Sequence, residues 1–213
     1  MHAAATIDLR DFEAELRKQS ARPDSIDWRP ALKVTAVYLE GEAKLCFDES
    51  RTPDGQPWAP IKHPMEGRGA GAKPLRDTDT LMAGMTASHA AGAVRRIDDT
   101  ELIFGSNDSR AATHNFGATI TPKNAKALTI PLTIEAARAG SPRNFPRPLF
   151  VLKPKDGGKS YLAERIGKRL KKHYLFSMKS VIPARQFVGL SERNIEDIQE
   201  IARDFGLEQW RAT

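Results

Sequence analysis

The segment from Asp27 to Asp48 constrains the fold more than any other part of the chain, because it predicts a long helix with one apolar face. Pro30 falls in the first turn, where the missing N–H of a proline leaves no helical hydrogen bond unmade. The apolar residues that recur on one side at helical spacing are Leu32, Ala36, Leu39, Ala43, Cys46 and Phe47. Such a face must be covered by a sheet or by other helices, so we expect it to lie on the core.

Short apolar and alternating runs later in the chain predict strands rather than further long helices. Asp98 and Asp99 separate the first two runs, which predicts a β-hairpin. Pro131 confines a later strand to a sheet edge, because proline cannot donate a backbone hydrogen bond. The expected strands cover residues 94–97, 102–104, 118–121, 128–132, 149–152, 161–163 and 174–178.

Further helices are expected at both ends of the chain and between the strands. An amphipathic helix is expected from Asp8 to Pro23. Near the C-terminal end, apolar residues recur at helical spacing from Ile195 to Phe205, with Ser191 or Asn194 as the N-cap and Gly206 as the end. The short helices between these ends are expected near residues 78–85, at 111–116 and at 134–138, the last capped by Thr133 and closed by Gly140.

Together these elements predict an α+β fold made of a single domain over residues 1–213. We expect a mainly antiparallel sheet of about four or five strands, packed on one side by the long helix and the C-terminal helix. Residues 51–74 are rich in proline and glycine and lack an apolar period, which predicts a mobile loop. Residues 148–182 predict a β-rich hairpin arm.

The charge balance and the cysteine count exclude several classes of protein. The 33 Lys and Arg against 27 Asp and Glu leave a net charge of +6, typical of a solvated surface more than of a dedicated polyanion binder. With Cys46 as the only cysteine, neither an intramolecular disulfide nor a thiolate zinc cluster is indicated, and a reducing cytoplasm is expected. No apolar run approaches the roughly 20 residues of a transmembrane helix, and the N-terminal residues do not resemble a signal peptide. We therefore expect neither membrane insertion nor export.

The residues do not suggest a catalytic centre, a metal site or a cofactor site. A catalytic or metal-binding His114 would need a second histidine or a pair of carboxylates at suitable spacing, and none is present, so a structural or interface role is expected. Asp77 and Asp79 could act as paired carboxylates, but a helix cap at Asp77 or Thr78 is the plainer interpretation. The Gly67–Gly69 segment lacks the strand, helix and Lys-Ser or Lys-Thr ending of a phosphate loop. We expect a protein that is not an enzyme and has no cofactor.

Two other features allow more than one interpretation. The run from Lys168 to His173 is the densest positive stretch, and it either grips phosphates or an acidic protein surface, or forms a solvated loop. Trp58, presented by a tight turn, either pins the loop onto the core or anchors a neighbouring subunit.

Three short segments have a distinct local chemistry. Pro53–Trp58 contains an Asp-Gly pair after proline, which forms a tight turn. In Thr113–Gly117, the glycine suits a helix C-cap. In Ile182–Gly189, Pro183 ends one element, and Phe187 and Val188 begin another apolar contact.

In this order, the three segments resemble motifs of the phage virion morphogenesis family, the tail completion proteins of Mu-like and related contractile-tailed phages. That family has a Pro-Asp-Gly-x-x-Trp turn, a Tyr-Ala-x-x-His-x-x-Gly stretch and an Ile-Pro-Ala-Arg-x-Phe segment. The resemblance extends from about Ala43 to Ile201. The chain departs from the pattern at Arg110, where the family usually has Tyr, and at Gln186, where Pro is common.

The resemblance implies a structural role: completing the tail or joining it to the filled head, as part of a homo-oligomeric ring at the neck, without catalysis. The implied partners are other phage tail and neck proteins and packaged DNA, and the implied location is the virion, after assembly in the host bacterial cytoplasm from a phage or prophage. The expected contact residues are Asp54, Trp58, His114, Phe116, Lys168, Arg169, Lys171, Lys172, Arg185 and Phe187. The alternative is a small basic nucleic-acid-binding protein that uses the Lys168–His173 run and Arg95–Arg96.

Overall fold

The long helix expected from the apolar pattern is present as α2 (Arg29–Glu49) in the computed structural model, which describes residues 3–8, 10, 27–61, 66 and 72–212. All six apolar residues of the expected face are buried. The helix ends where Ser50 adopts a left-handed conformation, with φ of 55°, and its N–H donates to the carbonyl of Cys46.

The chain folds as two compact units, each built from separate stretches of sequence. The first unit contains Met1–Ala59, Pro74–Phe116 and Ala184–Thr213, and the second contains Pro60–Lys73 and Gly117–Pro183. The polypeptide therefore passes between the units after Ala59, Lys73, Phe116 and Pro183. The segment 148–182, expected to form a β-rich arm, lies within the second unit.

The first unit has an antiparallel sheet in the order β1-β3-β2. The expected hairpin is formed by β2 (Ala93–Ile97) and β3 (Glu101–Ser106), and the N–H of Asp98 donates to the carbonyl of Glu101 across the turn. The other side of β3 pairs with β1 (Ala3–Asp8). The helix expected from Asp8 to Pro23 falls mostly on residues outside the described part of the chain.

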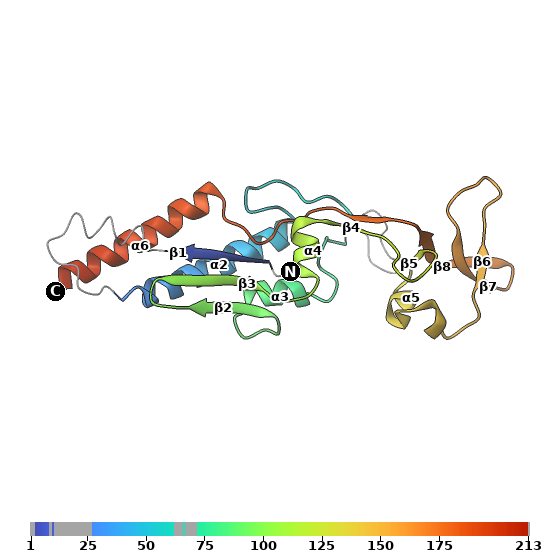
Figure 1. The fold of residues 1–213 in the computed structure, drawn as a ribbon, viewed down its shortest axis with the longest axis horizontal. Helices are drawn as coiled ribbons and strands as arrows, with labels where there is room; N and C mark the ends of the chain where they lie inside the picture. The colour runs from blue at the N-terminus through green and yellow to red at the C-terminus, as the bar shows by residue number, and fades with distance from the viewer. Residues whose placement is uncertain (1–2, 9, 11–26, 62–65, 67–71, 213) are drawn as a thin grey trace. The chain divides into compact units, whose positions relative to one another are not determined.

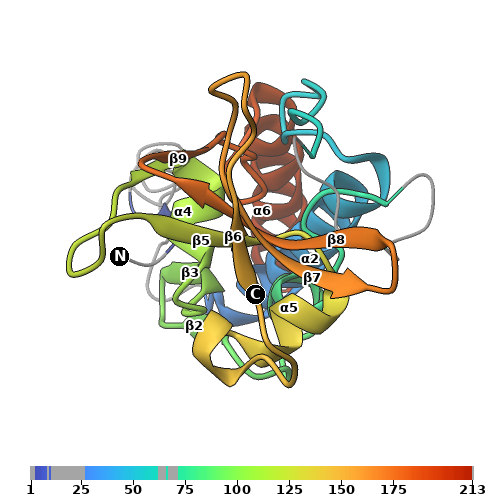
Figure 2. The ribbon, with the colours of Figure 1, turned by 90° about the vertical axis from the view of Figure 1, so that its right-hand side faces the viewer.

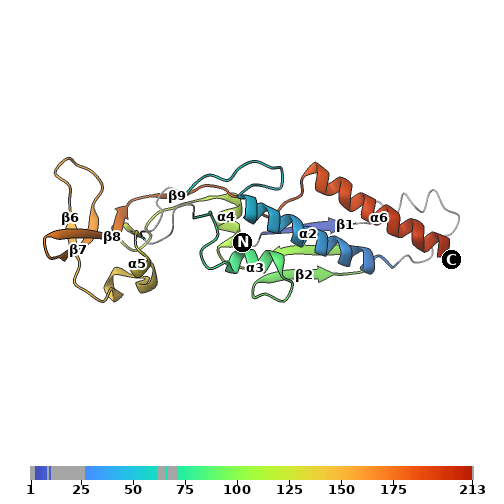
Figure 3. The same ribbon diagram turned by 180° about the vertical axis from the view of Figure 1, so that it is seen from behind.

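Helices cover this sheet on the side where the core lies. Figures 1 and 3 show α2 lying across one face of the sheet, with α3 (Thr80–Thr86) at its edge. The expected cap of α3 at Asp77 or Thr78 is wrong: Asp79 occupies the N-cap position, and its carboxylate accepts a hydrogen bond from Arg76 instead.

The C-terminal helix α6 (Glu192–Ala212) packs on α2 through Ile198 and Ala202, among others. Its cap is Ser191, whose Oγ accepts from the N–H of Asn194 at 3.1 Å. Gly206 does not end the helix as expected, because it is buried on the packed side and the helix continues past it. Tertiary packing here outweighs the low helix propensity of glycine.

The second unit is built on a four-stranded antiparallel sheet in the order β5-β8-β7-β6 (Figure 2). Its strands are β5 (Leu128–Pro131), β6 (Phe150–Leu152), β7 (Tyr161–Ile166) and β8 (Arg169–Ser177). Pro131 lies on an edge strand, as expected. The helix α5 (Ile134–Ala139) begins at Thr133, whose hydroxyl accepts from the N–H of Ala136, and the short 3₁₀ helix η1 (Pro142–Asn144) follows.

Residues 117–183 make up most of the second unit. A separate two-stranded ribbon pairs the beginning of this segment with its end. Following α4 (Ala111–Phe116), β4 (Ala118–Ile120) pairs antiparallel with β9 (Ser180–Ile182).

The expected α+β class with antiparallel sheets and two long helices is confirmed. The strands are divided among three sheets instead of one, because residues 117–183 bury a core of their own around Ala136, Phe145 and Tyr174.

Candidate functional site

Trp58 is part of the core of the first unit. The turn before it is closed by hydrogen bonds from Thr52 N–H to the carbonyl of Gln56 and from Gly55 N–H to the carbonyl of Thr52. The Trp58 ring is 6 % exposed and meets the edge of Phe47 at a centroid distance of 5.5 Å. Trp58 therefore pins the turn onto the core, while Asp54 remains exposed at the tip of the turn. The first eight residues of the expected mobile loop, 51–58, thus form a hydrogen-bonded turn, and residues 62–65 and 67–71 lie outside the described chain.

The segment from the third motif packs against this turn. The indole N–H of Trp58 donates to the carbonyl of Gln186 at 2.9 Å. Phe187 is buried, with its ring 5.3 Å from that of Phe47. The guanidinium Nε–H of Arg185 donates to the carbonyl of Ala59 at 2.8 Å. Two of the three motifs thus meet at the point where the chain first leaves the first unit.

The second motif joins them through Asn115, a residue that the sequence analysis did not select. Its buried Oδ1 accepts from the N–H groups of both Phe187 and Val188, each at 2.9 Å. The backbone N–H of Arg185 also donates to the carbonyl of His114 at 2.8 Å. The only sequence signal for Asn115 is its position inside a motif, since the partner amides are more than 70 residues away.

We call this group the motif junction: Trp58, Ala59, His114, Asn115, Arg185, Gln186 and Phe187. All of its residues belong to the first unit, and three of the four points where the chain leaves or rejoins that unit lie within two residues of it. Phe116, beside the junction, is 65 % exposed.

The electrostatics of the junction disfavour charge on its titratable groups. Burial lowers the pKa of His114, and the nearby guanidinium groups of Arg185 and Arg110 lower it further. Burial also lowers the pKa of Arg185. Nearby, the hydrogen bond from Arg110 lowers the pKa of Asp108 to about 2. A half-buried imidazole whose charged form is disfavoured suits a structural position better than proton transfer.

The junction contains no arrangement of nucleophile, base and orienting group. The buried Nδ1 of His114 has no hydrogen-bond partner among the described residues. In the same part of the chain, there is no group of three or more His, Cys, Asp or Glu side chains that could hold a metal ion. Chemically, the junction can hold three distant stretches of backbone together.

The basic run lies in the second unit and forms part of strand β8 rather than the solvated loop that was one interpretation. Lys168 and Arg169 are exposed at the turn between β7 and β8. Lys171 lies 3.9 Å from a carboxylate oxygen of Glu66, and the Lys172 ammonium lies 4.3 Å from the ring centroid of Tyr161. The run therefore begins with two exposed cations, Lys168 and Arg169. It continues with two cations, Lys171 and Lys172, that contact other side chains.

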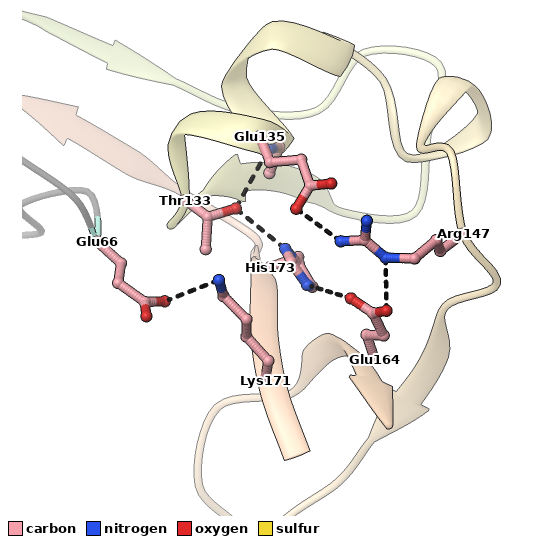
Figure 4. Close-up of polar contacts among 8 residues, drawn as sticks. Glu66, Thr133, Glu135, Arg147, Glu164, Lys171 and His173 are labelled. Atoms are coloured by element: carbon pink, nitrogen blue, oxygen red, sulfur yellow. Dashed lines mark hydrogen bonds and ion pairs between the residues drawn. The ribbon is translucent and has the colours of Figure 1, made fainter. Parts of the chain in front are cut away.

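His173, the last residue of the run, is completely buried. A register shift between Leu162 and Ala163 leaves His173 without a partner on β7, which is the geometry of a β-bulge. Figure 4 shows its ring between Thr133 and Glu164, with Nδ1 3.0 Å from the Thr133 hydroxyl and Nε2 3.0 Å from Glu164 Oε2. The Thr133 hydroxyl also accepts from the N–H of Ala136, so this one oxygen links the start of α5 to the His173 ring.

Arg147, which is itself exposed, extends this network from the buried His173 and Glu164 towards the surface (Figure 4). Its Nε–H donates to Glu164 and its Nη2–H to Glu135, at 2.5 and 2.7 Å. The hydrogen bond from Arg147 lowers the pKa of Glu164, and the one from His173 lowers it further. The network fixes the base of the β7–β8 hairpin, and the sequence analysis predicted only its Thr133 cap.

The net charge is divided very unequally between the two units. Within the bounds of the second unit, 17 Lys and Arg against 4 Asp and Glu give +13, whereas 16 against 23 give −7 in the first. The overall charge of +6 therefore hides a strongly basic unit and an acidic one. None of the described helices is long and apolar enough to cross a membrane.

No curated protein and no solved structure matches the chain. A family model does match, over residues 7–205 of the 213, a range that includes every residue of the motif junction. On that match, the chain belongs to the phage virion morphogenesis family.

Proposed function

We propose that this protein completes the phage tail and joins it to the filled head, as a structural component of the neck. Membership of the family supports a structural or morphogenesis role in the phage virion. The motif junction is the observation that carries the proposal further. Residues that resemble the motifs of tail completion proteins hold the backbone where the chain passes between the units. An assembly protein needs such fixed points to present two surfaces to two neighbours.

In this proposal the protein has no catalytic activity and no cofactor. The family suggests a non-catalytic role. Among the motif residues, Asn115 is used to bind two backbone N–H groups and Phe187 to pack on Phe47, so these two side chains are not available to act on a substrate. Purified protein should therefore show neither nuclease nor cell-wall hydrolase activity, with or without divalent metal.

The proposed partners are other phage tail and neck proteins, and further copies of the chain in a ring. The surfaces available for them include Asp54 at the tip of the turn, Phe116, and the exposed cations Lys168 and Arg169. Trp58 and Phe187 are buried in the core of the first unit, so they do not offer a surface to a partner. The protein would reside in the neck or tail of the virion after assembly in the host bacterial cytoplasm.

Inactivation of the gene in the phage or prophage that carries it tests the proposal. Electron microscopy of the lysate should show filled heads and separate tails that do not join. A plasmid copy of the gene should restore joined particles, and the same plasmid with an early stop codon is the matched control. Empty heads, absent tails or a normal titre would each contradict a role in joining.

A nucleic-acid-binding role is the second candidate, favoured by the +13 of the second unit. Arg95 cannot serve it, since this side chain donates to the carbonyls of Met85 and Gly105 and pairs with Glu40. Titration with duplex DNA separates the candidates: a DNA-binding protein should bind below micromolar concentration with a steep salt dependence. The neck role predicts weak binding that changes little with salt.

A further inference from the structure

The exposed end of the β7–β8 hairpin, residues 165–170, combines cations with apolar side chains. Arg165, Lys168 and Arg169 are exposed, and none has an ion-pair partner within 4.0 Å among the described side chains. Ile166 and Leu170 are 52 % and 46 % exposed. Ile166 is opposite Arg169, and Arg165 is opposite Leu170, so each face of the hairpin end presents one cation beside one apolar residue.

The first unit has a surface of the opposite charge along α6. Acidic residues occur at every fourth position, and all are exposed: Glu192, Glu196, Glu200, Asp204 and Glu208. Each step of four residues turns the position by about 40°, so the five side chains form a stripe, here called the acidic ridge, that rises about 24 Å along α6 and winds about 160° around it. Exposed apolar residues, Ile195 and Leu207, accompany the ridge.

Among the described side chains, no cation lies within 4.0 Å of a carboxylate of the ridge. The ion pair that the described part of α6 makes is between Arg193 and Asp197, outside the ridge. Like charges four residues apart destabilise a helix, and Arg203, three residues after Glu200, offsets only part of this repulsion, so a cationic partner that covers the ridge would stabilise α6. The opposite side of α6, through Ile198 and Ala202, packs into the core, which leaves the ridge free to face a partner.

We propose that the hairpin end of one copy of this chain docks on the acidic ridge of a second copy. The two surfaces match in charge, and each carries two exposed apolar residues that such a contact would bury. A duplex nucleic acid would satisfy the cations of the hairpin end but would leave Ile166 and Leu170 exposed and the ridge unpartnered. A second copy satisfies both surfaces at once.

This contact is head-to-tail, because it joins two different surfaces. A linear chain of such contacts leaves one unpaired surface at each of its two ends, and it closes into a ring when the rotation between neighbours brings those ends together. Only the closure at the neck rests on the proposed function. The contact itself is tested on the purified full-length protein, so failure of either can be recognised separately.

The first measurement is the molar mass by sedimentation over a series of protein concentrations. We expect the mass to rise above that of the monomer as concentration increases, and to fall back as salt is raised, because screening weakens contacts between exposed charges. A monomer at every concentration in low salt would overturn the proposal, including the case in which the hairpin end contacts the ridge of its own chain.

Charge reversal identifies the two surfaces. The variant Lys168→Glu/Arg169→Glu and the variant Glu196→Lys/Glu200→Lys should each be monomeric, with the dissociation constant raised at least about tenfold. An equimolar mixture of the two should associate again, since the acidic hairpin end of one then meets the basic ridge of the other. Unchanged melting temperatures show that each variant is folded.

Matched controls carry the same charge changes elsewhere. Lys153→Glu/Lys155→Glu alters exposed lysines of the second unit, and Asp98→Lys/Asp99→Lys alters an exposed turn of the first. Both should associate like the unaltered protein. Equal loss of association in the controls, or no recovery in the mixture, would refute the docking. So would a hairpin-end variant that loses duplex DNA binding but keeps its self-association.

Discussion

At the scale of single residues, Asn115 is the side chain on which the motif junction depends most. Replacing it by Ala removes the acceptor for the buried N–H groups of Phe187 and Val188. We expect Asn115→Ala to lower the free energy of unfolding by about 2–4 kcal/mol, because buried donors left without a partner retain their desolvation cost. Chemical denaturation followed by tryptophan fluorescence measures this. The exposed Asn107 is the control, and Asn107→Ala should change the free energy by less than about 0.5 kcal/mol. Equal effects would contradict the role of Asn115.

His114 gives the first unit a pH dependence of known sign. Its pKa in the folded state lies below the ordinary value of 6.5, so the unfolded chain binds more protons in this range. Stability should therefore fall as the pH drops below about 6.5 towards the folded-state pKa. Denaturation midpoints between pH 7 and 5 should show this slope, and His114→Gln should reduce it. The same slope in His114→Gln, or its loss in the exposed control His89→Gln, would assign the effect elsewhere.

At the scale of elements, the Trp58 side chain holds the turn at residues 51–58 against the core. Trp58→Ala should lower the free energy of unfolding by about 3–5 kcal/mol, since it removes a buried indole and its hydrogen bond to Gln186. Hydrogen exchange should also accelerate at Gly55 and Trp58, whose N–H groups are bonded within the turn. Asp54→Asn, at the exposed tip, is the control. Rapid exchange at these amides in the unaltered protein would show that the turn is not held.

The β7–β8 hairpin should tolerate changes at its end better than changes along its strands. Lys168→Gln/Arg169→Gln should leave the melting temperature nearly unchanged, because exposed charges contribute little to stability. Lys172→Gln should lower the stability by about 0.5–1 kcal/mol, since it loses the contact with the Tyr161 ring. Thermal melting of the two variants measures the difference. A large loss in the first variant would mean that these side chains pack on the unit.

At the scale of the whole molecule, the two units bury separate cores and should unfold separately. All three tryptophans, Trp28, Trp58 and Trp210, belong to the first unit. Tryptophan fluorescence should therefore follow the first unit alone, whereas far-ultraviolet circular dichroism follows both. We expect the two transitions in urea to have different midpoints. Coincident transitions would show that the chain unfolds as one cooperative unit.

The elements that were predicted correctly from the sequence are those that form because of interactions between neighbouring residues. The 3.6-residue period of α2, the Asp98–Asp99 turn, the Thr133 cap and the edge position of Pro131 each depend on a few neighbouring residues. The three motifs also identified the family, because their order and spacing can be read along the chain. The expectation at Gly206 was wrong because packing there outweighed the local preference. The expected cap of α3 was wrong because the helix begins after Asp79, whose carboxylate binds Arg76.

Only the tertiary structure decided which of these residues meet. The hydrogen bond from Trp58 to Gln186 spans 128 residues and those to Asn115 span more than 70, and no local pattern encodes such a pairing. The bulge that buries His173 depends on the register of β7 against β8. The division of the net charge into +13 and −7 depends on where the chain passes between units. Periodicity and turn chemistry act over a few residues, whereas distant contacts and charge separation arise from packing, which selects partners by shape and burial.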